Sequence, residues 1–232
     1  MNDLRKLGGI AALIHSAAYV VGIGLYFTVL NPVLDADPAQ YLALLAEHQN
    51  LLYVWILIAY WVAAFCLVIV ALALYDRLKT GSPALMQIGT ALGLIWAGLI
   101  IGSGNLMLHD FGEVAQLYSS NPAQAEVVLV ALTAVENGIV SGNELIGGLW
   151  ALLVSWTALR AGGFSKALSY FGLVSGAAGI ASIIPALNEV GITFFALGMI
   201  VWFAWVGIVL LRRTPGAAKK AEAFAPYHST TV

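Results

Sequence analysis

The chain has 232 residues and a formal net charge of −2, and 61% of its residues are hydrophobic whereas only 9% are charged. A soluble globular domain usually carries about 25% charged residues, so this composition argues against an ordinary soluble fold and indicates a chain surrounded by lipid. The single cysteine, Cys66, lies in an apolar run, which excludes a disulfide within the chain and a cluster of thiolate metal ligands.

Six apolar stretches have the length of a membrane-spanning helix, which needs about 20 mainly apolar residues. They cover residues 8–30, 51–75, 84–108, 127–159, 167–187 and 191–211. The first is longer than the roughly 7–15 residues of a signal-peptide core, so it is expected to remain as a helix. We predict an all-α fold, a six-helix transmembrane bundle over residues 1–213, followed by a tail at 214–232. The fourth stretch exceeds a bilayer of about 30 Å, so its helix is expected to tilt or to project from the outer face.

Sequence signals for helix starts agree with these boundaries. The dipeptides Ser82-Pro83 and Asn121-Pro122 have the residue types of an N-cap and a first helical position, and Gln124 fits a capping box. Asp37-Pro38 is predicted to start a short helix on the outer side that leads into the second span.

Basic residues all fall on one side of the six-span arrangement: Arg5, Lys6, Arg77, Lys79, Arg160, Lys166, Arg212, Arg213, Lys219 and Lys220. The other side has no basic residue and carries acidic ones: Asp35, Asp37, Glu47, Asp110, Glu113, Glu126 and Glu189. Because cytoplasmic loops of membrane proteins retain positive charge, both termini are predicted to lie in the cytoplasm.

Two further patterns are typical of membrane helices. Aromatic residues lie near predicted span ends, where interfacial belts form without any ligand: Tyr26, Phe27, Tyr53, Trp55 and Tyr75. Small residues recur four apart, which lets helix backbones approach closely: Gly98 with Gly102, Gly138 with Gly142, and Gly172 with Gly176. We expect these glycines to pack within the bundle, with a dimer face as the alternative.

Polar side chains concentrate in the fourth span, although an ionisable residue at membrane depth costs roughly 2.5–3.5 kcal/mol to insert. Residues seven apart lie on nearly one helix face, so Glu136 aligns with Asn143. In the adjacent row, Asn137 aligns with Glu144. The four are predicted to form one wall of a polar pocket near the outer face, opposite residues of the second and third spans: His48, Asn105, His109 and Asp110.

Three interpretations of this polar cluster are open. The side chains could be structural and hydrogen-bonded between helices. They could bind a cation, a proton or a small polar molecule. They could also form a catalytic site that depends on a metal, because His48, His109, Asp110 and a glutamate of the fourth span are ligand types that zinc accepts. No HExxH spacing supports a metal, so metal and cofactor remain unknown and no catalytic residue is assigned.

His15 lies apart from this cluster, about two turns into the first span. A lone histidine there is expected to bond a neighbouring carbonyl or serine, because no second histidine at matching depth could complete a bis-histidine haem site. The chain has no phosphate-binding loop, dinucleotide fingerprint or nucleophile elbow. It also has no basic patch on a folded surface for nucleic acid. An enzymatic role is therefore the least favoured.

Most of the chain resembles a known family. The similarity rests on Arg5 to Leu13, on Gly147-Gly148-Leu149-Trp150, on Ala158-Leu159-Arg160, on Phe164 to Gly172, and on Pro185. These segments resemble the domain of unknown function 4386 family of bacterial integral-membrane proteins. The resemblance implies a multi-span bundle in a bacterial cytoplasmic (inner) membrane, and it implies no activity and no functional residue.

Our first functional hypothesis is that the protein binds a small polar molecule or a cation in the outer pocket. The alternative is a non-catalytic subunit or assembly factor of a larger membrane complex, because little of the chain lies outside the predicted spans. A membrane-protein partner or a homo-oligomer would then be expected, beside the lipid bilayer itself. A transporter ranks third, since only Pro185 hints at the interrupted helices typical of transporters.

Overall fold

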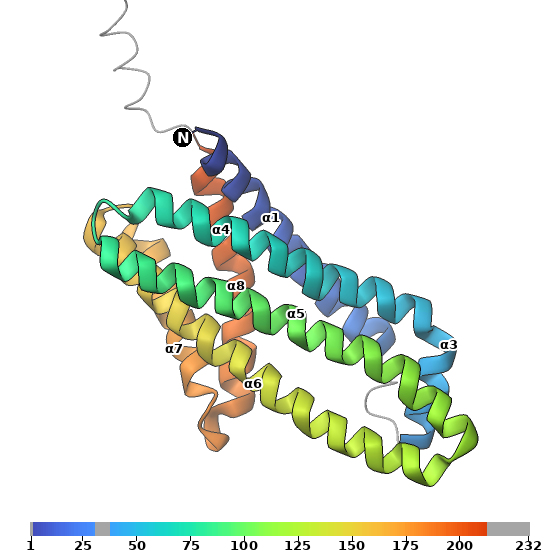
Figure 1. Ribbon diagram of the computed structural model, residues 1–232. Coiled ribbons are helices and arrows are strands. Elements are labelled where there is room, and N and C mark those ends of the chain that lie inside the picture. Colours follow the sequence, from blue (N-terminus) through green and yellow to red (C-terminus); the bar gives the residue numbers. More distant parts are fainter. Residues whose placement is uncertain (1, 31–37, 213–232) are drawn as a thin grey trace, which may run out of the picture.

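The computed structural model describes residues 2–30 and 38–212, and all regular elements within them are helical (Figure 1). This confirms the all-α prediction. The α-helices are α1 (Asn2–Leu25), α3 (Pro38–Ile56), α4 (Ala63–Leu78), α5 (Pro83–Ser120), α6 (Pro122–Ala161), α7 (Lys166–Ala181) and α8 (Asn188–Leu211). Two π-helices extend or join them, η1 (Tyr26–Leu30) and η2 (Leu57–Val62), and a 3₁₀ turn, η3 (Pro185–Leu187), precedes α8.

Five helical segments of the described chain are long and apolar enough to cross a membrane: Asp3–Thr28, Asn50–Leu78, Pro83–Ser120, Pro122–Ala161 and Pro185–Leu211. Helix α7, expected over 167–187, has only 16 residues, or about 24 Å at 1.5 Å per residue. It stops early because Pro185 lacks an N–H and holds the preceding Ile184 extended, with a ψ of 121°.

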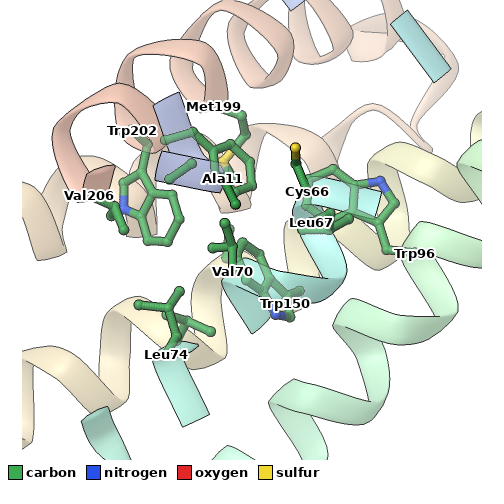
Figure 2. Packing of buried hydrophobic residues seen from close by; sticks show 14 of the residues in the cluster. Ala11, Cys66, Leu67, Val70, Leu74, Trp96, Trp150, Met199, Trp202 and Val206 are labelled. Atoms are coloured by element: carbon green, nitrogen blue, oxygen red, sulfur yellow. The ribbon is translucent and has the colours of Figure 1, made fainter. Parts of the chain in front are cut away.

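The helices form a closed ring. Each of α4, α5, α6 and α7 packs against the next helix along the chain, and α8 returns to pack against α1, which also contacts α4. The centre is filled by large side chains that are fully buried, including Trp150, Trp202 and Phe203. Figure 2 shows side chains from α1, α4, α5, α6 and α8 meeting there, among them Ala11, Val70, Trp96, Trp150 and Trp202.

Helices α5 and α6 are much longer than their partners. They contain 38 and 40 residues, and Figure 1 shows their hairpin running beyond the turn between α7 and α8. The predicted third span, 84–108, therefore continues as a helix to Ser120, because no helix-breaking residue occurs before Asn121-Pro122. A second apolar core holds this extension against α3 and η2, and it includes Leu52, Trp55, Ile56, Ala59, Met107, Val114 and Ala125.

The helix starts follow the sequence signals. Asn121 is the N-cap of α6, and its side-chain oxygen accepts a hydrogen bond from the Gln124 backbone N–H at 3.3 Å. Ser82 precedes α5 with Pro83 at the first position, although the serine side chain makes no capping bond. Asp37 lies outside the described residues. The helix that begins at Pro38 reaches a kink at His48, where the backbone leaves helical geometry, and α3 then continues through η2 into α4. A short helix therefore leads into the second membrane-length segment, Asn50–Leu78, as the sequence predicts.

The described basic residues gather at one end of the bundle, where α1 begins, α8 ends, and the α4–α5 and α6–α7 connections lie (Figure 1). At this end, Arg77 links α4 to the connection between α6 and α7. Its Nη2 donates a hydrogen bond to the Gly163 carbonyl at 2.9 Å, and its guanidinium lies 5.6 Å from the centre of the Phe164 ring. Gly162, which directly precedes Gly163, is the C-cap of α6, and its φ of 65° is a left-handed conformation that favours glycine.

The three glycine pairs behave differently. Gly172 and Gly176 of α7 pack tightly on α6, and a Cβ on Gly176 would lie 2.7 Å from the Gly148 carbonyl oxygen. In contrast, a Cβ on Gly98, Gly102 or Gly138 would meet no described atom within 4 Å. Only the α7 pair therefore serves the packing of the bundle in the way that the spacing predicts.

We predict that Gly176→Leu destabilises the bundle, because its side chain would push the α6 backbone away from α7. Overpacking of a close contact typically costs about 1–3 kcal/mol, which would lower the thermal unfolding midpoint of the protein in detergent by several degrees. The matched variant Gly98→Leu places the same side chain in open space and should leave the midpoint nearly unchanged. Equal midpoints for the two variants would show that the α6–α7 contact is not as close as described.

Candidate functional site

A cavity of about 260 Å³ lies at the junction between the two apolar cores. Its walls come from α1 and η1, from the joined α3–η2 helix, and from α5 and α6. The lining residues are Tyr19, Gly22, Ile23, Tyr26, Trp55, Ala59, Tyr60, Ile100, Asn143 and Glu144. It therefore combines a mainly aromatic wall with one amide and one carboxylate.

A short chain of hydrogen bonds orients the amide. The Ser103 hydroxyl is fully buried and donates its single proton to the Leu99 carbonyl at 3.0 Å. Its oxygen can then only accept, so Asn143 must turn its Nδ2 group toward it, at 3.3 Å. This arrangement uses one of the two N–H donors of Asn143 and leaves Oδ1 as an acceptor.

Two buried acceptors at the cavity wall lack a donor. Asn143 Oδ1 and Glu144 Oε2 have no hydrogen-bond partner among the described residues. A buried acceptor without a donor costs about 1–3 kcal/mol, and more when it is charged. Both residues line the same cavity, so a single bound group could reach both.

The charge around the cavity is entirely of one sign. Among the described residues that line it, Glu144 is the one with a formal charge. The sequence has no Lys or Arg between residues 80 and 159, so the α5–α6 hairpin has neither residue before Arg160 in the last turn of α6, while it carries Glu113, Glu126 and Glu136. Such an arrangement raises the local concentration of cations and repels anions.

The aromatic wall is held in place from within. The Trp55 side chain is 7% exposed, and its Nε1 donates to the Gly22 carbonyl at 2.9 Å. Its ring meets that of Tyr60 edge to face, with centroids 5.5 Å apart. Gly22 lets α1 approach η2 closely, because a Cβ there would lie 2.8 Å from Ala59 Cβ. The π-helices η1 and η2 contribute Tyr26 and Tyr60, and π-helical turns occur frequently at functional sites.

A smaller cavity of about 80 Å³ shares Tyr19, Asn143 and Glu144 with the first and extends toward α8. His15 lines it and is only 1% exposed. The His15 Nδ1 lies 2.7 Å from the Ala63 carbonyl oxygen, and a carbonyl can only accept, so Nδ1 carries the proton. This agrees with the expectation that His15 bonds a neighbouring carbonyl.

The predicted stripe of the fourth span divides along α6. Asn143 and Glu144 line both cavities. Glu136 and Asn137 lie two turns nearer the start of α6 and line neither cavity. Glu136 is partly buried and Asn137 is exposed. The stripe therefore meets the cavities only at its inner end.

The predicted opposite wall does not form from the expected residues. His48 lies at the kink in α3, with φ and ψ of −106° and 16°, and Asn105 is exposed on α5. Neither residue lines either of the two cavities described above. His109 and Asp110 belong to α5, and their side chains lie outside the described part of the structure. Within that part, no group of three or more His, Cys, Asp or Glu residues could hold a metal ion.

Sequence reasoning missed the aromatic residues of the cavity and the proximity of His15 to Glu144. Tyr26 and Trp55 were assigned to an interfacial belt because they lie near span ends. The sequence contains one signal for the proximity of His15 to Glu144, namely the depth of each residue along its helix. At 1.5 Å per residue, His15 lies about 20 Å from the start of α1, and Glu144 lies about 26 Å from the end of α6. Counting from the same end of the bundle would have placed the two at similar heights.

These features define a class of protein: an all-helical bundle with helices of membrane-spanning length and a partly open cavity beside a half-buried glutamate. Residues 9–214 match the family described as Domain of unknown function (DUF4386), and the chain belongs to this family. The match confirms the resemblance found in the sequence. Comparison with curated proteins and with solved structures gave no match.

The hydrogen bond of His15 gives a spectroscopic prediction. In protein labelled with ¹⁵N-histidine, the Nδ1 of His15 should have the chemical shift of a protonated ring nitrogen, because it donates to the Ala63 carbonyl. The signal is assigned by its loss in His15→Asn. A proton found only on Nε2 would contradict the described orientation of the ring.

Proposed function

We propose that this protein is an integral membrane protein of a bacterial cytoplasmic membrane that binds a small cationic molecule or ion in the cavity at Glu144. The observation that carries the proposal is the pair of buried acceptors, Asn143 Oδ1 and Glu144 Oε2, in a cavity whose described lining contains no positive side chain. A ligand with positive charge and hydrogen-bond donors satisfies both atoms. The six-span arrangement with cytoplasmic termini, which includes α7 as a short crossing, is part of this proposal.

The energetics favour a cation over an anion or a neutral guest. Removing a carboxylate from water costs several kcal/mol even after relaxation. A cation about 4 Å away recovers roughly 4 kcal/mol at an effective dielectric constant of about 20. A neutral ligand would leave the charge of Glu144 without compensation, and an anion would add repulsion.

Access from the outer side is supported by the position of the cavity. It lies at the inner end of the α5–α6 extension, which has acidic and no basic side chains. If the basic end of the bundle is cytoplasmic, this extension faces the other side of the membrane. Cations there would be attracted toward the cavity by the acidic residues of the extension.

A non-catalytic subunit of a larger membrane complex is the second candidate function. One observation favours it: Gly98, Gly102 and Gly138 offer open faces where a Cβ would meet no described atom within 4 Å. Glycine faces of this kind allow another helix to approach closely. Native mass spectrometry of the protein extracted gently from its own membrane distinguishes the two candidates. A partner chain would favour the subunit, and a bound small mass would favour the binding protein.

We predict that Glu144→Gln abolishes stabilisation by the bound cation. The thermal unfolding midpoint of the detergent-purified protein is measured with equal concentrations of sodium, potassium, ammonium and n-butylammonium chloride. A cation at 100 times its Kd stabilises the folded state by about 2.7 kcal/mol, so at least one salt should raise the midpoint of the natural protein by several degrees. Glu144→Gln keeps the shape of the side chain, removes its charge, and should lose this shift.

Glu126→Gln is the matched control, because Glu126 is exposed on the same helix and does not line the cavity. It should keep the full shift. The proposal fails if no cation stabilises the natural protein, or if Glu144→Gln responds to each cation as the natural protein does.

A further inference from the structure

We propose that the ligand of the Glu144 cavity is an organic ammonium ion with at least two N–H donors, such as a primary alkylammonium, rather than a metal ion. This inference rests on the proposed function and names the chemical class of the ligand. It follows from three properties of the cavity: its size, the type of its hydrogen-bonding atoms, and its aromatic wall.

The size favours a small organic molecule. A volume of about 260 Å³ is close to the lower end of the roughly 300–1,000 Å³ that small-molecule pockets have. A bare metal ion would leave most of this space to water. It would also need more carboxylate, carbonyl or water oxygens, since calcium takes about 6–8 such ligands and magnesium needs a nearly ideal octahedron, whereas the side chains that line the cavity offer one carboxylate, one amide and three tyrosine hydroxyls.

The hydrogen-bonding atoms define the head of the ligand. The bond from Asn143 Nδ2 to Ser103 fixes the amide so that Oδ1 is the acceptor, and a carboxylate of Glu144 has only acceptors. Asn143 Oδ1 and Glu144 Oε2 therefore call for two donors from one ligand. A primary ammonium has three N–H groups and a positive charge, so it can bond both atoms at once. A quaternary ammonium has the charge but cannot donate to either atom.

The aromatic wall defines the environment of the rest of the ligand. The one polar atom of the Trp55 side chain, Nε1, already donates a hydrogen bond to the Gly22 carbonyl. Trp55 can therefore contact a ligand only through its π face and apolar edge. Tyr19, Tyr26 and Tyr60 line the same space. Aromatic faces within about 6 Å of a cation attract it by roughly 0.5–2 kcal/mol each, and they also cover an alkyl chain. Such a wall suits an alkylammonium better than a hydrated inorganic ion.

Binding to the natural full-length protein in detergent tests this inference by isothermal titration calorimetry with four probes. These are n-butylammonium, its N-trimethylated analogue, the neutral 1-butanol, and potassium. We expect n-butylammonium to bind most tightly, with the trimethylated ion and 1-butanol each at least tenfold weaker. Potassium at tenfold excess should not displace n-butylammonium.

Two variants test the wall. Tyr60→Leu removes one ring from the cavity and should weaken n-butylammonium about 2- to 30-fold, the range of one cation–π contact. Tyr53→Leu is the matched control, because Tyr53 is exposed and does not line the cavity; it should bind as the natural protein does. The comparison of the four probes on the natural protein does not depend on how well either variant folds.

The outcomes separate the inference from the proposed function. Binding of potassium or sodium that depends on Glu144, without binding of n-butylammonium, overturns the inference and leaves the proposed function standing. Equal affinity for 1-butanol or for the trimethylated ion also overturns it, because the charge or the N–H donors would then be irrelevant. Absence of binding by every cation overturns both.

Discussion

The cost of burying the Glu144 carboxylate in an apolar bundle is the constraint around which this structure is arranged. An ionised group at membrane depth needs a partner, yet the adjacent Asn143 donates to Ser103 and leaves Glu144 Oε2 without a donor among the described residues. Packing alone would favour an apolar residue at this position. We propose that a bound cation supplies the missing partner.

The position of Glu144 follows from the way the two cores meet. The main core, centred on Trp150 and Trp202, fills the closed ring of six helices. The second core joins α3 and η2 to the long α5–α6 hairpin, beyond the short α7. Where one core gives way to the other, α1 and α6 are not packed directly on each other, and the two cavities occupy this space.

Hydropathy and charge predict the helical class, the approximate helices and the caps at Pro83 and Pro122, because these depend on local composition and on backbone chemistry. They also single out Asn143 and Glu144 as costly residues. The early end of α7 and the continuation of α5 to Ser120 were missed, since hydropathy does not mark helix ends. The roles of Trp55 and His15 depend on contacts with Gly22 and Ala63 across the bundle, and no pattern along one helix encodes them.

The most direct test of the central claim is whether Glu144 makes the cavity selective for cations. In a Cys66→Ala background, Ile23→Cys places a thiol in the cavity wall, and its reaction rates with 2-aminoethyl and 2-sulfonatoethyl methanethiosulfonate are each divided by those of a free thiol. We expect the positively charged reagent to react much faster than the negative one, and Glu144→Gln to abolish this preference. An unreactive thiol, or a preference that is the same with and without Glu144, would contradict the account.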